Sequence, residues 1–169
     1  MKKITTRNLV MIALLSGLSY LFFMWEIKII DPLEFDFSDL FVMIAGYSMG
    51  VGPGILVAVI KNILHLMFKN SGLIGEVTNV VYALLIMIPV AMFKVDGWKE
   101  KLALYITVVI FVSLSINVFN YFISMPIYGI PSPERIPMIV SVFIPFNIIK
   151  TSILLLVFTL IKPILDNIN

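Results

Sequence analysis

Long apolar runs, broken by short polar or glycine- and proline-containing stretches, make up most of this 169-residue chain. The runs predict six helices, at about residues 5–24, 37–49, 55–68, 76–93, 102–125 and 136–161. An α-helix needs about 20 mostly apolar residues to cross a bilayer. The second and third runs are shorter, so these helices are expected to be tilted, broken or partly covered by protein. The pattern predicts an all-α integral membrane protein, a six-transmembrane-helix bundle in which residues 1–169 form one membrane domain.

The connections between the runs differ in character. A polar, carboxylate-rich segment at 25–36 follows the first run. Loops are expected at 69–75 and 94–101, and a proline-rich connection is expected at 126–134. Because glycine and proline favour turns, a tight turn is expected between the second and third runs, at Gly50, Gly52, Pro53 and Gly54.

Composition supports a membrane protein, since 60% of the residues are hydrophobic and no hydrophilic stretch is long enough to fold separately. The net charge is only +2, and the 12 basic residues lie mostly near the chain ends and in one loop, so nucleic acid is not expected as a partner. The chain has no cysteine, which excludes disulfides and thiolate metal sites. It has one histidine, so neither a metal site nor a cofactor is expected.

The distribution of basic residues predicts the orientation. Lys2, Lys3 and Arg7 precede an apolar run in the manner of a secretory signal, but the run continues to Met24 without a small-residue cleavage site, so it is interpreted as a retained span. With six crossings, both termini lie on one side together with the 94–101 loop. That side is rich in lysine, which predicts cytoplasmic termini. The opposite, external side collects carboxylates: Glu26, Asp31, Glu34, Asp36, Glu76 and Glu134.

The last apolar run contains the most informative polar pair. Asn147 and Lys150, three residues apart, share a helix face at or near membrane depth, and Pro145 removes a backbone donor in the same turn. A lysine in the hydrocarbon core costs at least roughly 2.5–3.5 kcal/mol on insertion scales, so an idle one is not expected there. Lys150 is therefore predicted to bind a ligand. The alternative is that it pairs with a carboxylate and holds the bundle together.

Further amides and aromatic residues occur on neighbouring runs. Asn117 and Asn120 lie one turn apart and are followed by Tyr121. These amides could satisfy each other, but together with Asn147 and Lys150 they suit a planar heteroaromatic ligand with carbonyl and ring-nitrogen acceptors. Glu76 and Asn79, at the external start of the fourth helix, point to the same pocket, although Glu76 could instead only stabilise the helix N-terminus.

Two other groups of residues are candidates for structural or partner contacts. Lys61 is expected to form an ion pair with Asp39 or Asp36. The neighbouring His65 is expected to be a hydrogen-bonded packing residue. Ala13 and Gly17, four residues apart on the first helix, would let another helix approach closely, either within this chain or in a partner.

The repeat of small residues Gly46, Gly50, Gly54 and Ala58 is interpreted as internal packing of the second and third helices.

The sequence lacks the motifs of several classes of enzyme. The chain has no Walker-type phosphate loop, no H-E-x-x-H and no G-x-S-x-G, so an enzyme is not expected. An intramembrane protease using Ser38, Asp36 and Asp39 remains the alternative from a different functional class. The two halves show no convincing internal repeat, so an inverted-repeat secondary transporter is poorly supported.

The order of motifs is similar to that of a known family: Asp36-Phe37-Ser38-Asp39, Gly52-Pro53, Lys61-Asn62, Gly75-Glu76 with Asn79, Asn120-Tyr121-Phe122, and Ile144 through Lys150. The chain resembles, over nearly its whole length, the substrate-binding S components of energy-coupling factor (ECF) vitamin transporters, and most closely the riboflavin-specific branch. The resemblance implies a six-helix subunit of the bacterial plasma membrane. Such a subunit captures a B-type vitamin from outside and works with a transmembrane coupling subunit and two ABC-type ATPases.

The resemblance also implies roles for particular residues. The asparagine of the N-Y-F motif, and the asparagine and lysine of the P-F-N-I-I-K motif, would bind the flavin ring; here they are Asn120, Asn147 and Lys150. Small residues on the first helix, usually two alanines, would contact the coupling subunit, and here they are Ala13 and Gly17. Because the segment between Gly129 and Ile144 is short for a riboflavin binder, hydroxymethylpyrimidine or a pyridoxine-type vitamin remains an alternative ligand.

Overall fold

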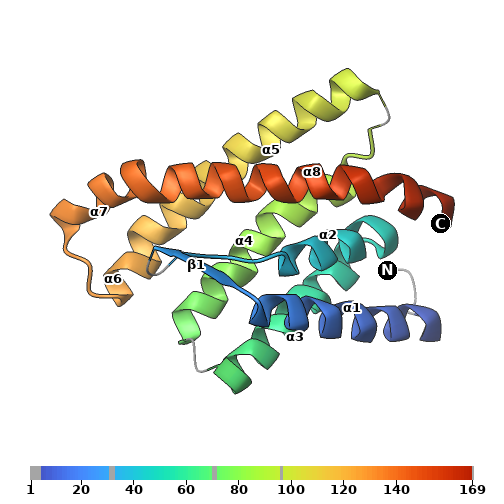
Figure 1. Cartoon of the computed structure of the whole chain (residues 1–169), viewed down its shortest axis with the longest axis horizontal. Coiled ribbons are helices and arrows are strands. Elements are labelled where there is room, and N and C mark those ends of the chain that lie inside the picture. The colour runs from blue at the N-terminus through green and yellow to red at the C-terminus, as the bar shows by residue number, and fades with distance from the viewer. Residues whose placement is uncertain (1–4, 31–32, 70–71, 96, 169) are drawn as a thin grey trace.

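The computed structural model describes residues 5–30, 33–69, 72–95 and 97–168, and these are almost entirely helical (Figure 1). The first half contains α1 (Thr6–Met24), β1 (Ile27–Ile30), β2 (Leu33–Phe35), α2 (Ser38–Met49), α3 (Val51–Lys69) and α4 (Leu73–Met92). The second half contains α5 (Trp98–Phe119), α6 (Met125–Ile127), α7 (Ser132–Met138) and α8 (Ile144–Ile168). Two π-helical stretches, Asn120–Ser124 and Ile139–Phe143, join α5 to α6 and α7 to α8.

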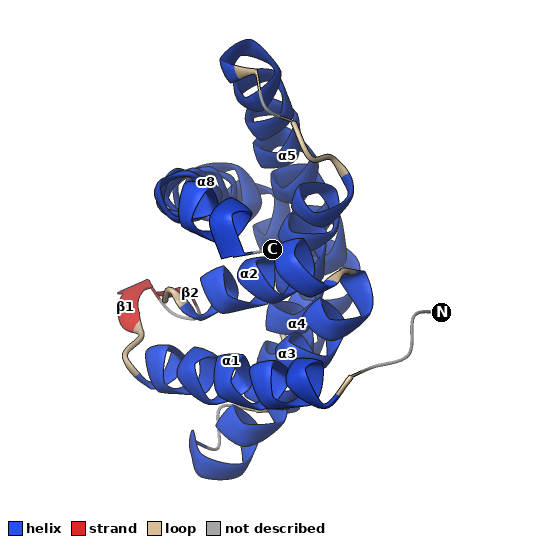
Figure 2. Cartoon of the chain, turned by 90° about the vertical axis from the view of Figure 1, so that its right-hand side faces the viewer, coloured by secondary structure: helices blue, strands red, loops and turns tan. Residues whose placement is uncertain are grey.

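Five helical segments within the described residues are long and apolar enough to cross a membrane: Thr6–Met24, Val51–Lys69, Leu73–Met92, Trp98–Ile127 and Ser132–Asn167. The sixth, α2, has only 12 residues. It lies among other helices in Figure 2, and most of its side chains are buried. The predicted all-α, six-helix membrane bundle is confirmed, and α2 is the short, protein-covered helix that the pattern indicated.

Several predicted boundaries were wrong. The third helix is 19 residues long and starts at Val51, so it is not short. Gly50 alone makes the turn, with a positive φ of 100° that favours glycine. Pro53 lies in the first turn of α3, where no intrahelical partner is needed for its missing N–H. α4 and α5 also begin a few residues earlier than predicted, and the last predicted helix begins as α7, at Ser132.

The segment after α1 is a β-hairpin and not an irregular loop. β1 and β2 are antiparallel, with Ile27 opposite Phe35 and Lys28 opposite Glu34. In Figure 2, which looks at the bundle from the end that carries both chain termini, β1 lies at the outer edge of the bundle. Asp31, one of the predicted external carboxylates, lies outside the described residues, as do Lys2 and Lys3.

Close packing in the first half of the bundle depends on glycine. Gly46 of α2 and Gly54 of α3 form a slot that holds the Met87 thioether of α4. A Cβ added at Gly54 would lie 2.9 Å from the Met87 sulfur, and one added at Gly46 would overlap it. The predicted internal packing of this glycine series thus extends to a third helix.

α4 connects two halves of the bundle. It packs against α2 and α3 on one side and against α5 on the other, while α5 packs against α8. The N-terminal end of α1 and the C-terminal end of α8 lie at the same end of the molecule (Figure 1). The hairpin and α6 lie toward the opposite end, where a cavity opens between the two halves.

Candidate functional site

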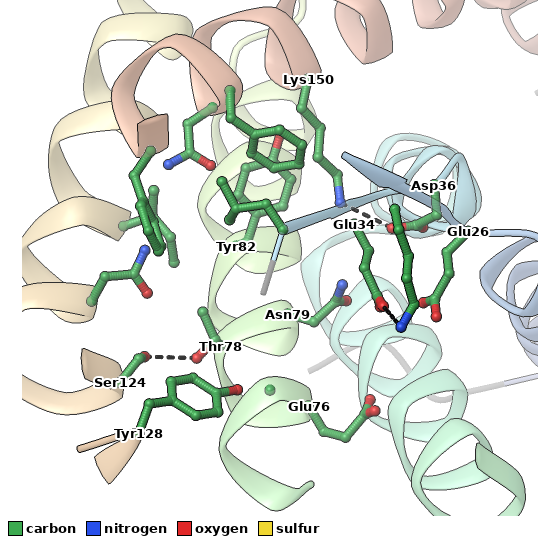
Figure 3. Close-up of a pocket in the computed structure, with 18 of the residues that line it drawn as sticks. Glu26, Glu34, Asp36, Glu76, Thr78, Asn79, Tyr82, Ser124, Tyr128 and Lys150 are labelled. Atoms are coloured by element: carbon green, nitrogen blue, oxygen red, sulfur yellow. Dashed lines mark hydrogen bonds and ion pairs between the residues drawn. The ribbon is translucent and has the colours of Figure 1, made fainter. Parts of the chain in front are cut away.

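A cavity of about 440 Å³ lies at the end of the bundle that carries the hairpin and α6, and Figure 3 draws residues that line it. Its wall is formed by the end of α1, the hairpin, the C-terminal part of α3, the N-terminal half of α4, the π-helical stretch after α5 and the start of α8. Its polar lining residues are Glu26, Lys28, Glu34, Asp36, His65, Lys69, Glu76, Thr78, Asn79, Asn120, Ser124, Asn147 and Lys150. Its aromatic lining residues are Phe23, Tyr82, Tyr128, Phe143 and Phe146.

Five of the six predicted ligand-binding residues line this one cavity: Asn120, Asn147, Lys150, Glu76 and Asn79. They come from α4, the α5 side and α8, and are up to 74 residues apart in the sequence (150 − 76).

Tyr121 does not line the cavity. Its ring packs edge-on against Phe122, with the ring centres 4.9 Å apart, and lies beneath the Arg135 guanidinium. Neighbouring residues of a helix point roughly 100° apart, so Asn120 and Tyr121 do not both face inward.

The π-helical stretch begins at Asn120, which is buried. A π-turn widens the helix locally and is frequent at functional sites. Ser124, at the end of the stretch, hydrogen-bonds with Thr78 of α4, with 2.8 Å between the hydroxyl oxygens. This bond joins the α5 side of the cavity to α4 below Asn120. The widened turn was not predicted from the sequence.

Two amides in the lining have polar atoms without a hydrogen-bond partner among the described residues. Asn147 is buried and its Nδ2 donates to no acceptor, and the Oδ1 of Asn79 accepts from no donor. A buried polar group without a partner costs about 1–3 kcal/mol. These atoms therefore point to a ligand that supplies an acceptor near α8 and a donor near α4.

Lys150 both lines the cavity and forms an ion pair, so the expected pairing with a carboxylate is present, while ligand binding by Lys150 stays a prediction. Its Nζ lies 2.9 Å from Asp36 Oδ2 and 3.5 Å from Asp39 Oδ2. The same ammonium group lies 4.9 Å from the centre of the Tyr82 ring. Because an ammonium has three donors, one remains available for a ligand beside Asp36.

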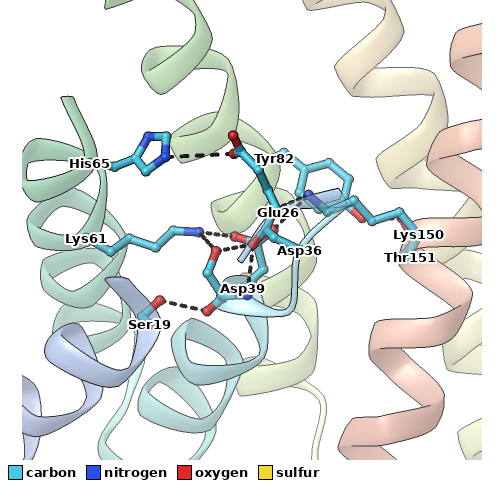
Figure 4. Close-up of polar contacts among 10 residues, drawn as sticks. Ser19, Glu26, Asp36, Asp39, Lys61, His65, Tyr82, Lys150 and Thr151 are labelled. Carbon is cyan, nitrogen blue, oxygen red and sulfur yellow. Dashed lines mark hydrogen bonds and ion pairs between the residues drawn. The ribbon is translucent and has the colours of Figure 1, made fainter. Parts of the chain in front are cut away.

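Lys61 completes a buried network of two lysines and two aspartates (Figure 4). Its Nζ donates to Asp39 Oδ1 and to the Ser38 hydroxyl, each at 2.5 Å. Asp39 is thus the contact partner of Lys61, and Asp36 that of Lys150. The Ser38 hydroxyl donates to Asp36, which joins the two pairs. With two positive and two negative charges, the network is neutral as a whole.

Asp36 is charged in this network. Burial opposes its ionisation, but the ammonium groups of Lys150 and Lys61 and the hydrogen bond from Ser38 outweigh burial and lower its pKa from 3.8 to about 2. The network therefore presents Lys150 to the cavity with a fixed anionic partner behind it.

A second charged cluster in the cavity lining was not predicted from the sequence. It consists of Glu26, His65, Lys69 and Glu76. His65 Nδ1 lies 2.6 Å from Glu76 Oε1, and its Nε2 lies 3.8 Å from Glu26 Oε2. Lys69 is in contact with Glu26. The His65 ring stacks on Phe23 with their centres 3.7 Å apart. One sequence signal for this cluster was available. Lys61, His65 and Lys69 follow one another at intervals of four residues, which places them on one face of α3.

The described residues contain no group of three or more histidine, aspartate, glutamate or cysteine side chains placed to hold a metal ion. The chemistry available in the cavity is that of amide and ammonium donors, carboxylate acceptors and aromatic faces. Such a lining suits a small polar molecule with a planar ring.

Ala13 and Gly17 lie away from the cavity, on the outer surface of α1. Ala13 is exposed, and no atom lies within 4 Å of a Cβ placed at Gly17. The neighbouring Ser16 and Ser19 point inward, and the Ser19 hydroxyl donates to the Ser38 carbonyl at 2.7 Å. Ala13 and Gly17 therefore do not pack closely against another helix of the described chain.

The apolar six-helix bundle and the cavity with polar and aromatic lining at one end define a membrane-embedded binding protein for small molecules. The family model "ECF transporter, substrate-specific component" matches residues 7–162. The chain belongs to this family of substrate-specific components of ECF transporters.

Individual relatives agree with this membership. The chain is 30% identical over 173 residues to the riboflavin transporter RibU of Staphylococcus aureus (strain TCH60), a match that covers 95% of this chain and 91% of that protein. It is 27% identical to the riboflavin transporter FmnP of Bacillus subtilis (strain 168), covering 92% of this chain and 90% of that protein. A solved structure, described as the S component of a bacterial ECF transporter, matches with a TM-score of 0.81 and 28% identity, over 96% of both chains.

Proposed function

We propose that this chain captures riboflavin from outside the cell for an ECF importer. The observation that carries the proposal is the convergence of Asn120, Asn147 and Lys150 on one cavity with aromatic walls. The volume of about 440 Å³ is within the range of roughly 300–1,000 Å³ typical of small-molecule sites. Two relatives that match over nearly their whole length are riboflavin transporters, which supports the same ligand here.

The lining offers matching groups for both parts of riboflavin. The isoalloxazine ring carries carbonyl and ring-nitrogen acceptors, which suit the Lys150 ammonium and the Nδ2 of Asn147. Tyr82, Phe143 and Phe146 provide aromatic faces beside the ring. The hydroxyls of the ribityl chain can donate to acceptors at the other end of the cavity, where Glu76 and the Oδ1 of Asn79 lie.

In the proposed role the chain is a single membrane domain, residues 1–169, in the bacterial plasma membrane with both termini in the cytoplasm. A transmembrane coupling subunit and two ABC-type ATPases supply the energy, since the chain itself has no phosphate-binding loop. Ala13 and Gly17 are the proposed contact with the coupling subunit, because small side chains on an outward face let a second helix approach closely.

The protease alternative finds no support in the geometry of its candidate residues. Asp36 and Asp39 are held in ion pairs with Lys150 and Lys61, and the Ser38 hydroxyl is used between Asp36 and Lys61. A nucleophile needs a base that is free to accept its proton, whereas both carboxylates here are neutralised by lysine.

The ligand is tested by equilibrium titration of the purified, ligand-free protein in detergent. Riboflavin fluorescence should be quenched on binding, with saturation at one riboflavin per chain. Excess pyridoxine or hydroxymethylpyrimidine should not displace the riboflavin. Displacement by either, or no riboflavin binding while one of them binds, would assign the cavity to a smaller vitamin.

A further inference from the structure

The two sides of the β-hairpin differ sharply in polarity. Lys28 and Glu34, opposite each other on β1 and β2, both line the cavity, and their charged groups lie 3.6 Å apart. Successive residues of a strand point to opposite sides, so Ile27, between the lining residues Glu26 and Lys28, faces away from the cavity. Ile29 stands at an irregularity in the strand pairing and does not line the cavity either. Both isoleucines are exposed, at 60% and 54% of their surface. The cavity side of the hairpin is thus polar, with the Lys28 side chain 69% exposed, and its other side carries exposed isoleucines.

This polarity is the reverse of what a hairpin in water requires. A two-stranded sheet with one side toward water normally carries its polar residues on that side. Trp25, between α1 and β1, is 81% exposed and adds a large aromatic ring to the same region. Exposed apolar clusters of this kind mark a surface that is covered by something apolar.

The position of the hairpin indicates what covers it. α1 ends at Met24, and Trp25 is the next residue, so the hairpin begins where the first span leaves the hydrocarbon core. Leu18, Leu21 and Phe22, near the end of α1, are exposed on the lipid-facing outside of the bundle. Figure 2 shows β1 at the edge of the bundle, so its outer side faces sideways, in the same general direction as the lipid.

We propose that the outer side of the hairpin, formed by Trp25, Ile27 and Ile29, is a membrane-binding surface that lies in the interface of the outer leaflet. Tryptophan is enriched at the boundary between head groups and acyl chains, where its ring is apolar and its N–H reaches water. The two isoleucines continue the lipid-facing surface of α1 beyond the end of the helix. The bilayer then holds one wall of the cavity from outside, since the opposite side of the same strand carries Lys28.

The test uses the fluorescence of Trp25 in liposomes. The chain has two tryptophans, and Trp98 lies at the start of α5, at the end of the bundle that carries the termini. Trp98→Phe therefore leaves Trp25 as the single reporter. The ligand-free protein is reconstituted into phosphatidylcholine vesicles that contain either lipids brominated on the acyl chains or iodide on both sides of the membrane.

The proposal predicts that brominated lipids quench Trp25, most strongly when the bromines lie near the head-group end of the chain, and that iodide quenches it weakly. Adding Ile27→Asn and Ile29→Asn should shift the emission to the red and raise the iodide quenching constant several-fold. Lys28→Gln, on the inner side of the same strand, is the matched control and should leave both readouts unchanged.

Two results would overturn the proposal. Strong iodide quenching without quenching by brominated lipids would place the outer side of the hairpin in water. Protection from both quenchers would mean that it is covered by protein, for example by a second copy of the chain.

Discussion

Lys150 is predicted to contribute to both ligand binding and folding, and a charge-neutral double substitution separates the two contributions. Lys150→Met removes one of the two positive charges from the buried network and leaves Asp36 and Asp39 with Lys61 alone. Removing one member of a buried ion pair costs about 3–5 kcal/mol, because the remaining charge stays buried without its partner. Stability should therefore fall by roughly that amount.

Lys150→Met combined with Asp36→Asn restores neutrality, since Lys61 and Asp39 still form their pair at 2.5 Å. Most of the lost stability should return in this double variant. Vitamin binding should not return, because the ammonium donor is missing. A hydrogen bond to a charged group contributes about 1.5–3 kcal/mol. Its loss should therefore raise the dissociation constant of the vitamin by roughly 10- to 150-fold.

The assay combines denaturation and riboflavin titration, both in detergent, for the wild type, the two single variants and the double variant. The reasoning would be refuted if the stability losses of the single variants simply added in the double variant, because additivity means that Lys150 and Asp36 do not interact. Full recovery of binding in the double variant would show that Lys150 serves only the fold.

Three further predictions concern other parts of the bundle. Lys61→Met should lower stability by about 3–5 kcal/mol, and adding Asp39→Asn should recover part of this loss. If thermal melts show no recovery, Lys61 and Asp39 do not form a stabilising ion pair. Gly46→Ala should destabilise the fold by about 1–3 kcal/mol, because the added Cβ overlaps the packed Met87 side chain. Gly17→Ala, in open space, should cost little stability. Equal stability losses in the two variants would contradict the packing of Met87 against Gly46. Ala13→Leu with Gly17→Leu should leave riboflavin binding by the isolated chain intact and abolish co-purification with the coupling subunit. Normal ATP-dependent uptake into vesicles would remove these two residues from the proposed interface.

The helices could be predicted from the sequence because lipid imposes a strong and simple pattern. An apolar run long enough to span the bilayer is visible without any knowledge of contacts. Helix ends were less predictable, since Gly52 and Pro53 favour a turn in general but are tolerated in the first turn of α3. The hairpin was missed because its two strands have only four and three residues, too few for an alternating pattern to emerge.

The candidate site was partly visible because unpaired polar residues in apolar runs have few possible roles. That argument grouped Asn120, Asn147 and Lys150 as ligand-binding candidates, but it did not find the carboxylate partner of Lys150. The pairing of Lys150 with Asp36 spans 114 residues and depends on how α8 and the hairpin pack, which no local pattern encodes. Tyr121 was included for its proximity in sequence to Asn120, and helix geometry turns it away from the cavity.

The most direct test of the proposed function is the identity of the small molecule that co-purifies with the chain. The protein is expressed in cells that make riboflavin, extracted in mild detergent, purified and denatured, and the released compound is identified by its absorption spectrum and mass. We expect riboflavin, close to one per chain, and far less from the Asn147→Leu variant expressed in parallel, because this change removes the free amide donor from the cavity. Release of a different vitamin from the wild-type chain, or equal amounts of riboflavin from both proteins, would contradict the proposed riboflavin site.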